Sequence, residues 1–280
     1  MSSAGAPADP GNNDPLTVPD TAFNTLEGWT WIGCYGGYYL SCDLLESHRF
    51  EHGFFTRRWQ GRQPDELATY LSAGITVHRP QQVHSSIVLE ASTADRPPWP
   101  DGDGLVSDRG SQSLWVCGAD CTPVLLADPE SGHVAACHAG WRGVAKGILR
   151  EAVQRLEQRG GKREQLLVAL GPAISGASYQ VEQTVAEQVL ASLSPGGQRA
   201  AISIDSELRA RIVQNDPSPG RCRLDIRAAA TAQLQAAGLD ATRISQCPLC
   251  TMEEPALFHS WRRDQVKAVQ WSGIVSQADL

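Results

Sequence analysis

The spacing of hydrophobic and polar residues predicts many short strands and a smaller number of longer helices. Residues 28–45 alternate aromatic and small side chains around Gly36 and Gly37, a pattern typical of a β-hairpin. Short runs rich in Val, Ile and Leu predict further strands elsewhere. These predicted strands cover residues 83–89, 113–117, 124–126, 134–137, 166–170 and 266–274.

Helical periodicity is clearest in residues 143–160, where Gly160 and Gly161 end the pattern. Apolar residues recur there every four positions, with charged residues on the other side. The recurring apolar residues are Val144, Ile148, Ala152 and Leu156. Three more helices are predicted, over 64–73, over 181–193 and from a cap at Asp225 to Gly238.

Strands alternate with helices in the middle of the chain, and both ends are richer in strands. We therefore predict a mixed α/β (α+β) fold, with mixed β-sheets flanked by helices in one catalytic domain over residues 26–280. Residues 1–25 are expected to form a disordered tail, since they are rich in small polar residues and Pro. The stretches 194–200 and 215–220 are expected to be surface insertions because of their Pro, Gly, Ser and Asn content.

Composition and charge favour a globular protein with a small-molecule partner. The chain has 280 residues, 41% of them hydrophobic, eight Trp and a formal net charge of -7. This charge predicts no nucleic-acid partner, and the lack of an 18-residue apolar run predicts no membrane span. The N-terminus has neither a basic start nor an apolar stretch, so we expect no secretory signal and a cytoplasmic location. The eight cysteines should then be reduced.

The densest cluster of chemically active residues lies between Cys117 and Gly143. Cys121 precedes one predicted strand and His138 follows the next, so a hairpin-like return would bring their side chains together. His84 precedes another strand. Zn²⁺ binds thiolate and imidazole, and three ligands with an open position are typical of a catalytic site. The spacing alone leaves a purely structural role open for each of the three.

Residues 139–143, Ala-Gly-Trp-Arg-Gly, form a glycine-rich turn into the predicted helix. Such a turn can bind an anion through free backbone N–H groups, and Arg142 adds a donor suited to phosphate. An ordinary strand-to-helix turn explains the pattern equally well. Cys247 and Cys250 form a single C-x-x-C pair, which without a second pair does not predict a structural zinc site.

Several sequence blocks together resemble the laccase-domain, or polyphenol oxidase-like, family, whose members are also described as purine nucleoside phosphorylases and peptidoglycan editing factors. The blocks occur in the family's order and cover nearly everything after residue 28. They are HGFFTR at 52–57, QVH at 82–84, DGLVSD at 103–108, ADCTPVLLADP at 119–129, HAGWRG at 138–143, GPAI at 171–174 and FHSWRRD at 258–264.

The resemblance implies a zinc site formed by His84, Cys121 and His138, and a fold similar to cysteine hydrolases that carry a Cys–His pair. It implies phosphorolysis of adenosine, inosine, guanosine and S-methyl-5′-thioadenosine, together with adenosine deamination. A copper-dependent phenol oxidase activity is attributed to some members, but three ligands do not supply a multicopper cluster. Arg142 is the first candidate for binding phosphate, with Arg57 and Arg263 as further candidates.

The chain departs from the family pattern at Ser85, where Gly is usual, and at Arg58-Trp59-Gln60, where a Gly pair is usual. These changes predict an altered substrate preference with the chemistry retained. A second hypothesis is a peptidoglycan-precursor editing hydrolase with Cys121 as nucleophile and His138 as base. A third is a non-enzymatic binding protein, which would have no need for a converging thiolate and two imidazoles.

Overall fold

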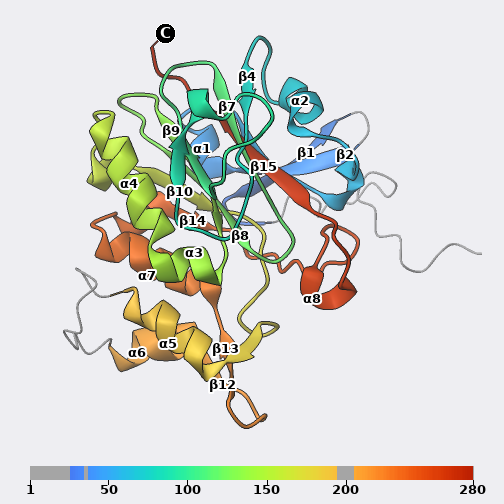
Figure 1. Ribbon diagram of the computed structural model, residues 1–280, viewed down its shortest axis with the longest axis vertical. Coiled ribbons are helices and arrows are strands. Elements are labelled where there is room, and N and C mark those ends of the chain that lie inside the picture. Colours follow the sequence, from blue (N-terminus) through green and yellow to red (C-terminus); the bar gives the residue numbers. More distant parts are fainter. Residues whose placement is uncertain (1–25, 35–36, 194–204, 280) are drawn as a thin grey trace, which may run out of the picture.

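The computed structural model describes residues 26–34, 37–193 and 205–279 (Figure 1). The predicted tail, 1–25, and the predicted insertion at 194–200 both lie outside the described residues. In the part of the chain that is described, no helix has the length and apolar character needed to cross a membrane.

The first six-stranded sheet joins the two ends of the chain. Its strand order is β1 (Trp29–Cys34), β2 (Gly37–Cys42), β3 (His52–Phe55), β15 (Gln270–Val275), β7 (Gln112–Gly118) and β4 (Thr76–His78). The predicted hairpin is confirmed, because β1 and β2 pair antiparallel. The predicted strand 266–274 is wrong at its start, since its first residues lie in an exposed segment and pairing begins at Gln270.

The second six-stranded sheet contains His138, and Cys121 directly precedes one of its strands. Its order is β14 (Ile244–Gln246), β10 (Leu167–Leu170), β8 (Thr122–Ala127), β9 (Val134–Ala139), β6 (Gly104–Val106) and β5 (Val88–Glu90). Strands β8 and β9 form the expected antiparallel hairpin. The predicted strand 83–89 is wrong for most of its length. Backbone amides in that stretch donate to the Asp103 carboxylate instead of a neighbouring strand, so pairing starts at Val88.

The two large sheets pack on each other, and helices cover the far side of the second sheet. Val124 and Leu126 of β8 belong to the core shared with the helices. Leu125 and Ala127, which alternate with them, belong to the core between the sheets. Every residue of β8 and β9 is buried, as expected for strands covered on both faces. A third apolar cluster, around Trp59, Trp115 and Trp271, covers the outer face of the first sheet.

The long helix predicted over 143–160 is divided into α3 (Trp141–Lys146) and α4 (Ile148–Gln158). Gly147 adopts the left-handed conformation, with φ of 86°, which ends α3. Figure 1 shows α3 and α4 beside α7 (Ile226–Ala236) along one side of the molecule. The Asp225 cap of α7 is confirmed, because its carboxylate accepts the Ala228 N–H at 2.9 Å. The stretch 64–73 contains one short helix, α2 (Pro64–Leu67), followed by a 3-10 turn.

A small antiparallel sheet extends the molecule beyond the helices (Figure 1). It consists of β11 (Gln180–Glu182), β12 (Val213–Asn215) and β13 (Arg221–Leu224), beside α5 (Gln183–Ala191) and α6 (Ser206–Ile212). The helix predicted over 181–193 thus begins two residues later, after β11. The 215–220 insertion is the turn between β12 and β13. Strands of three or four residues are too short to show a period, so the sequence did not predict them. The predicted mixed α/β fold class is confirmed.

Candidate metal centre and substrate cavity

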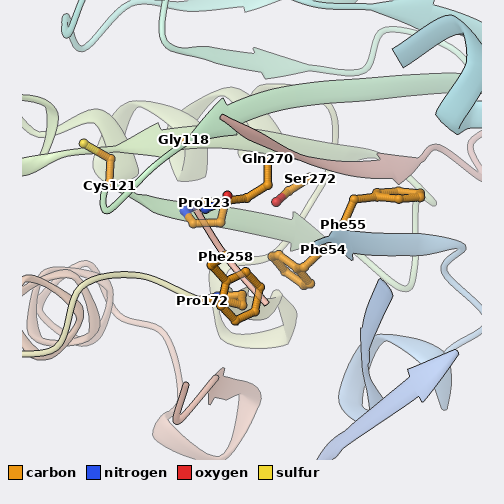
Figure 2. Close-up of a pocket in the computed structure, with 9 residues that line it drawn as sticks. All are labelled: Phe54, Phe55, Gly118, Cys121, Pro123, Pro172, Phe258, Gln270 and Ser272. Carbon is orange, nitrogen blue, oxygen red and sulfur yellow. The ribbon is translucent and has the colours of Figure 1, made fainter. Parts of the chain in front are cut away.

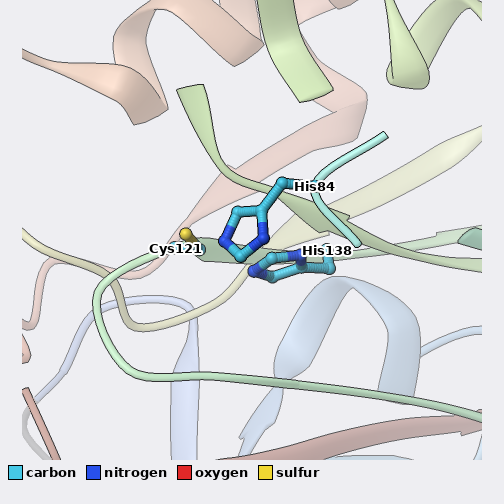
Figure 3. A group of neighbouring side chains, drawn as sticks. All are labelled: His84, Cys121 and His138. Carbon is cyan, nitrogen blue, oxygen red and sulfur yellow. The ribbon is translucent and has the colours of Figure 1, made fainter. Parts of the chain in front are cut away.

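The three predicted ligands converge on one point. The ligand atoms of His84, Cys121 and His138 all lie within 4.8 Å of one another (Figure 3). Cys121 precedes β8 and His138 lies in β9, and the pairing of Thr122 with Ala139 brings the two together. His84 comes from the loop before β5, and its ring crosses the His138 ring at 79°, with centroids 4.9 Å apart.

The buried Asp103 carboxylate organises two of these ligands. It accepts hydrogen bonds from the backbone N–H groups of His84 (3.0 Å) and Ser85 (2.6 Å), and from the Ser85 hydroxyl (2.8 Å). It also lies 2.9 Å from His138 Nδ1. Because an ionised carboxylate can only accept, Nδ1 carries the proton and Nε2 is left free for a ligand. One side chain therefore fixes both the His84 loop and the His138 tautomer.

The backbone around the ligands is tightly constrained. His84 has a φ of 58° and Asp120, next to Cys121, has a φ of 96°, both in the left-handed region. A Cβ atom added at Gly140 would lie 2.7 Å from Cys121 Sγ, so glycine is required where the HAGWRG segment passes the cysteine.

The electrostatics favour charged forms at this site. Burial acts to raise the pKa of Asp103, but the hydrogen bonds from His138 and Ser85 lower it further, to about 2. Burial also opposes ionisation of Cys121 and His138. Their mutual attraction and hydrogen bonding overcome this effect, so the pKa of Cys121 lies below its usual range and that of His138 above it. When no metal is bound, both pKa shifts favour the charged forms, a Cys121 thiolate and a His138 imidazolium.

A thiolate and two imidazoles, with one imidazole oriented by a carboxylate, fit a transition-metal ion. Within the described residues, this is the one group of three or more His, Cys, Asp and Glu side chains compact enough to hold a metal. The other cysteines are free thiols. Among them, Cys250 accepts the Ser175 N–H and Cys247 lies in the core between the sheets.

The ligand set opens into a cavity of about 690 Å³. Aromatic side chains on its walls are Trp141, Tyr179 and Trp261. The segment 261–269, which contains the short helix α8 (Trp261–Asp264), supplies one side of the cavity and includes the exposed Val266 and Val269. Figure 2 shows a second pocket beside Cys121, between Phe54 and Phe258, with the Cys121 sulfur directed away from these rings. Its volume of about 10 Å³ has room for one water molecule at most.

The three predicted phosphate-binding arginines are in different surroundings. Arg142 is exposed, lines the cavity and stacks its guanidinium on Trp141 at 4.6 Å. Arg57 donates to the Pro255 carbonyl at 2.6 Å. Arg263 donates to the Thr251, Met252 and Phe258 carbonyls and to Asp264. The structure therefore brings Arg142 to the ligand set and directs the other two at backbone oxygens.

Several residues of the site were not singled out from the sequence. Asp103 lies in the DGLVSD block, but nothing in the pattern indicates that its carboxylate contacts His138. Tyr179, Arg262 and Lys267 line the cavity although they are far from Cys121 in sequence. The carboxylate of Asp120 accepts the Thr251 hydroxyl and the Arg262 N–H, both at 2.7 Å. These hydrogen bonds join segments that are more than 100 residues apart, so the sequence pattern does not reveal them.

Together, the fold and the site define a mixed α/β protein with a candidate metal centre on the wall of a small-molecule cavity. Residues 63–276 match the family model described as multi-copper polyphenol oxidoreductase laccase, and the chain belongs to this family. A purine nucleoside phosphorylase of Synechocystis sp. is 38% identical over 258 residues, covering 89% of this chain and 97% of the relative. A purine nucleoside phosphorylase of Deinococcus radiodurans is 34% identical, covering 89% and 85%.

Solved structures show the same architecture. The crystal structure of YlmD from Geobacillus stearothermophilus superimposes with a TM-score of 0.74 at 26% identity, over 88% of this chain and 98% of that one. A Bacillus licheniformis protein, YfiH, gives a TM-score of 0.72 at 24% identity, over 85% and 96%. The fold expected from the sequence blocks is thus confirmed by these neighbours.

Proposed function

We propose that the protein is a zinc-dependent purine nucleoside phosphorylase. Its proposed substrates are adenosine, inosine, guanosine and S-methyl-5′-thioadenosine, with adenosine deamination as a side activity. The observation that carries this proposal is the convergence of His84, Cys121 and His138 beside a cavity of about 690 Å³. Relatives named purine nucleoside phosphorylase that align over most of the chain support it.

Zinc is the proposed metal because its usual ligands are thiolate and neutral imidazole. When bound, the ion supplies a Lewis acid that can polarise an oxygen or nitrogen of the substrate. Copper fits less well, because a multicopper centre needs more ligands than the single group of three found in the described residues.

The residues of the chain have separable roles in this proposal. Asp103 holds His138 with Nε2 available, and Cys121 contributes a negative charge at the same point. In phosphorolysis the bond between ribose C1′ and the purine nitrogen breaks, a bond from C1′ to a phosphate oxygen forms, and the base leaves with a proton. Arg142 is the proposed phosphate ligand among the three predicted arginines, because it is the one that lines the cavity.

The cavity matches a nucleoside in size and character. Small-molecule sites range from roughly 300 to 1,000 Å³, and this cavity has about 690 Å³. The flat rings of Trp141, Tyr179 and Trp261 on its walls suit stacking against a purine. We further propose that residues 26–280 form the catalytic unit and that it works in the cytoplasm, which the eight free thiols support.

One experiment tests the main proposal. The purified protein is analysed for metal, and its reactions with adenosine and inosine are followed by chromatography with and without phosphate. We expect about one zinc per chain and release of free base only when phosphate is present. Conversion of adenosine to inosine without phosphate would report the deaminase activity. Zinc-containing protein that leaves every nucleoside unchanged would refute the proposal.

The thiolate–imidazolium pair of Cys121 and His138 also favours a second candidate, a peptidoglycan-precursor editing hydrolase with Cys121 as nucleophile. A metal-bound thiolate alkylates slowly, whereas a free thiolate of lowered pKa alkylates quickly. We expect iodoacetamide to label Cys121 slowly in zinc-loaded protein and faster after chelation. Rapid labelling of Cys121 at full zinc occupancy would overturn the ligand role and support the hydrolase.

A further inference from the structure

Three cationic side chains line the cavity beside the ligand set, and they are Arg142, Arg262 and Lys267. Among the described residues that line this cavity, Asp120 is the one Asp or Glu, and its two carboxylate oxygens accept the Thr251 hydroxyl and the Arg262 backbone N–H. Even with Cys121 counted as a thiolate, the three cationic side chains outnumber the anionic ones in this lining, in a protein whose net charge is -7. A concave site of one sign concentrates ligands of the opposite sign.

Arg262 is held in a fixed orientation within this cavity. Its backbone N–H is fixed by Asp120, one Nη1–H donates to the Gln180 carbonyl at 2.8 Å, and the guanidinium lies 5.1 Å from the centre of the Tyr179 ring. A guanidinium has five N–H donors, so these contacts orient the group and leave donors for a ligand. A pre-oriented planar donor suits the bidentate binding of an oxyanion.

Its neighbour Arg263 provides the contrast within the same short helix. The Arg263 guanidinium donates to three backbone carbonyls and to Asp264, which uses both terminal nitrogens and Nε. These bonds tie the segment around α8 to residues 251–258. Of these two consecutive arginines, Arg263 holds the local backbone in place and Arg262 lines the cavity.

Arg142 lines the same cavity from the first turn of α3. The Trp141 and Tyr179 rings also line one smaller pocket together with Cys121, so the two aromatic groups lie close to each other. Arg142 stacks on Trp141 and Arg262 on Tyr179, so each planar group is supported by a ring.

We infer that inorganic phosphate binds in the cavity between Arg142 and Arg262, with Lys267 as a third cationic donor. This assignment rests on the proposed function and identifies two phosphate-binding residues, Arg262 and Lys267, in the 261–269 segment. Asp120 is a positioning residue in this site, because it precedes Cys121 in the chain and its carboxylate accepts the backbone N–H of Arg262.

The test is calorimetric titration of inorganic phosphate into metal-loaded protein, compared for the wild type, Arg262→Gln, Lys267→Gln and the control Lys146→Gln. Lys146 is an exposed cation of the same helix as Arg142 and lies outside the cavity lining. Loss of charged hydrogen bonds should weaken phosphate binding at least about tenfold in Arg262→Gln and about threefold in Lys267→Gln. Lys146→Gln should remain within about twofold of the wild type.

Arg262→Lys is a second variant that tests whether misfolding explains the weaker phosphate binding. It keeps the positive charge and the long side chain of Arg262 but loses the planar guanidinium. It should raise the KM for phosphate while leaving that for nucleoside nearly unchanged. Unchanged phosphate affinity in both Arg262→Gln and Lys267→Gln would overturn the inference. Protein that binds phosphate through Arg262 but cleaves no nucleoside would leave the inference standing and refute the proposed function.

Discussion

The ligand set and the 261–269 segment both line one cavity, yet they are built in different ways. The ligand set of His84, Cys121 and His138 is held by a buried hairpin and by the Asp103 carboxylate, which accepts hydrogen bonds from several directions. The 261–269 segment is exposed, mixes apolar and cationic side chains, and is tied down mainly through Asp120 and Arg263. The first arrangement holds the three candidate ligands in one geometry. The exposed side chains of the second can be substituted with little effect on that geometry.

The largest expected effect comes from breaking the ligand set. His84→Ala and His138→Ala each remove one of three ligands, so zinc content should fall well below one per chain and activity should drop to background. Metal analysis and nucleoside turnover measure this, with circular dichroism to show that the fold persists. His48→Ala is the matched control, because this exposed histidine bonds locally to Leu44. Full zinc occupancy in both ligand variants would contradict the assignment.

A smaller loss is expected when the support behind the ligands is removed. Asp103→Asn should weaken zinc binding by roughly 10- to 100-fold, the usual cost of losing a carboxylate that orients a metal-binding histidine. Competition with a chelator measures this affinity. Zinc affinity equal to that of the wild type would show that His138 keeps its orientation without Asp103.

Asp103→Asn should also change how the free energy of unfolding of the metal-free protein depends on pH. The pKa of Asp103 is about 2 when folded, below its ordinary value of 3.8, so the carboxylate stabilises the fold above pH 4 and this contribution is lost as the pH falls towards 2. At pH 7 the contribution is about 2 kcal/mol. Urea unfolding should therefore separate wild type from Asp103→Asn at pH 7 and bring them together near pH 2. A difference that persists at low pH would contradict this account.

The smallest effect is expected in the exposed segment. Trp261→Ala removes one stacking surface worth about 1 kcal/mol, which should raise the KM for nucleosides roughly fivefold and leave zinc content unchanged. Trp261→Phe should restore most of the loss. A fall in metal content in Trp261→Ala would show that this segment also supports the ligand set, and the contrast between the two sides would disappear.

The sequence alone determined the parts of this protein that depend on local pattern. Alternation predicted the β1–β2 hairpin, apolar runs predicted the strands of the β8–β9 hairpin, periodicity predicted the apolar face of α4, and Asp225 identified the start of α7. The sequence blocks identified the family and singled out the three candidate ligands, since a thiolate and two imidazoles are recognisable by type and motif. The left-handed Gly147 that divides the long helix was missed, because helical periodicity continues across it.

Only the tertiary structure decided which groups act together. Asp103 and His138 are 35 residues apart, and Asp120 and Arg262 are 142 apart, so neither hydrogen bond leaves a local signal. Arg262 and Arg263 are adjacent and chemically identical, yet one lines the cavity while the other donates to backbone carbonyls. The direction of each side chain follows from the segments packed against it, which hold Asp120 and Gln180 for Arg262 and residues 251–258 for Arg263. A charged group's function depends on the partners that this packing provides, and the order of residues along the chain does not specify them.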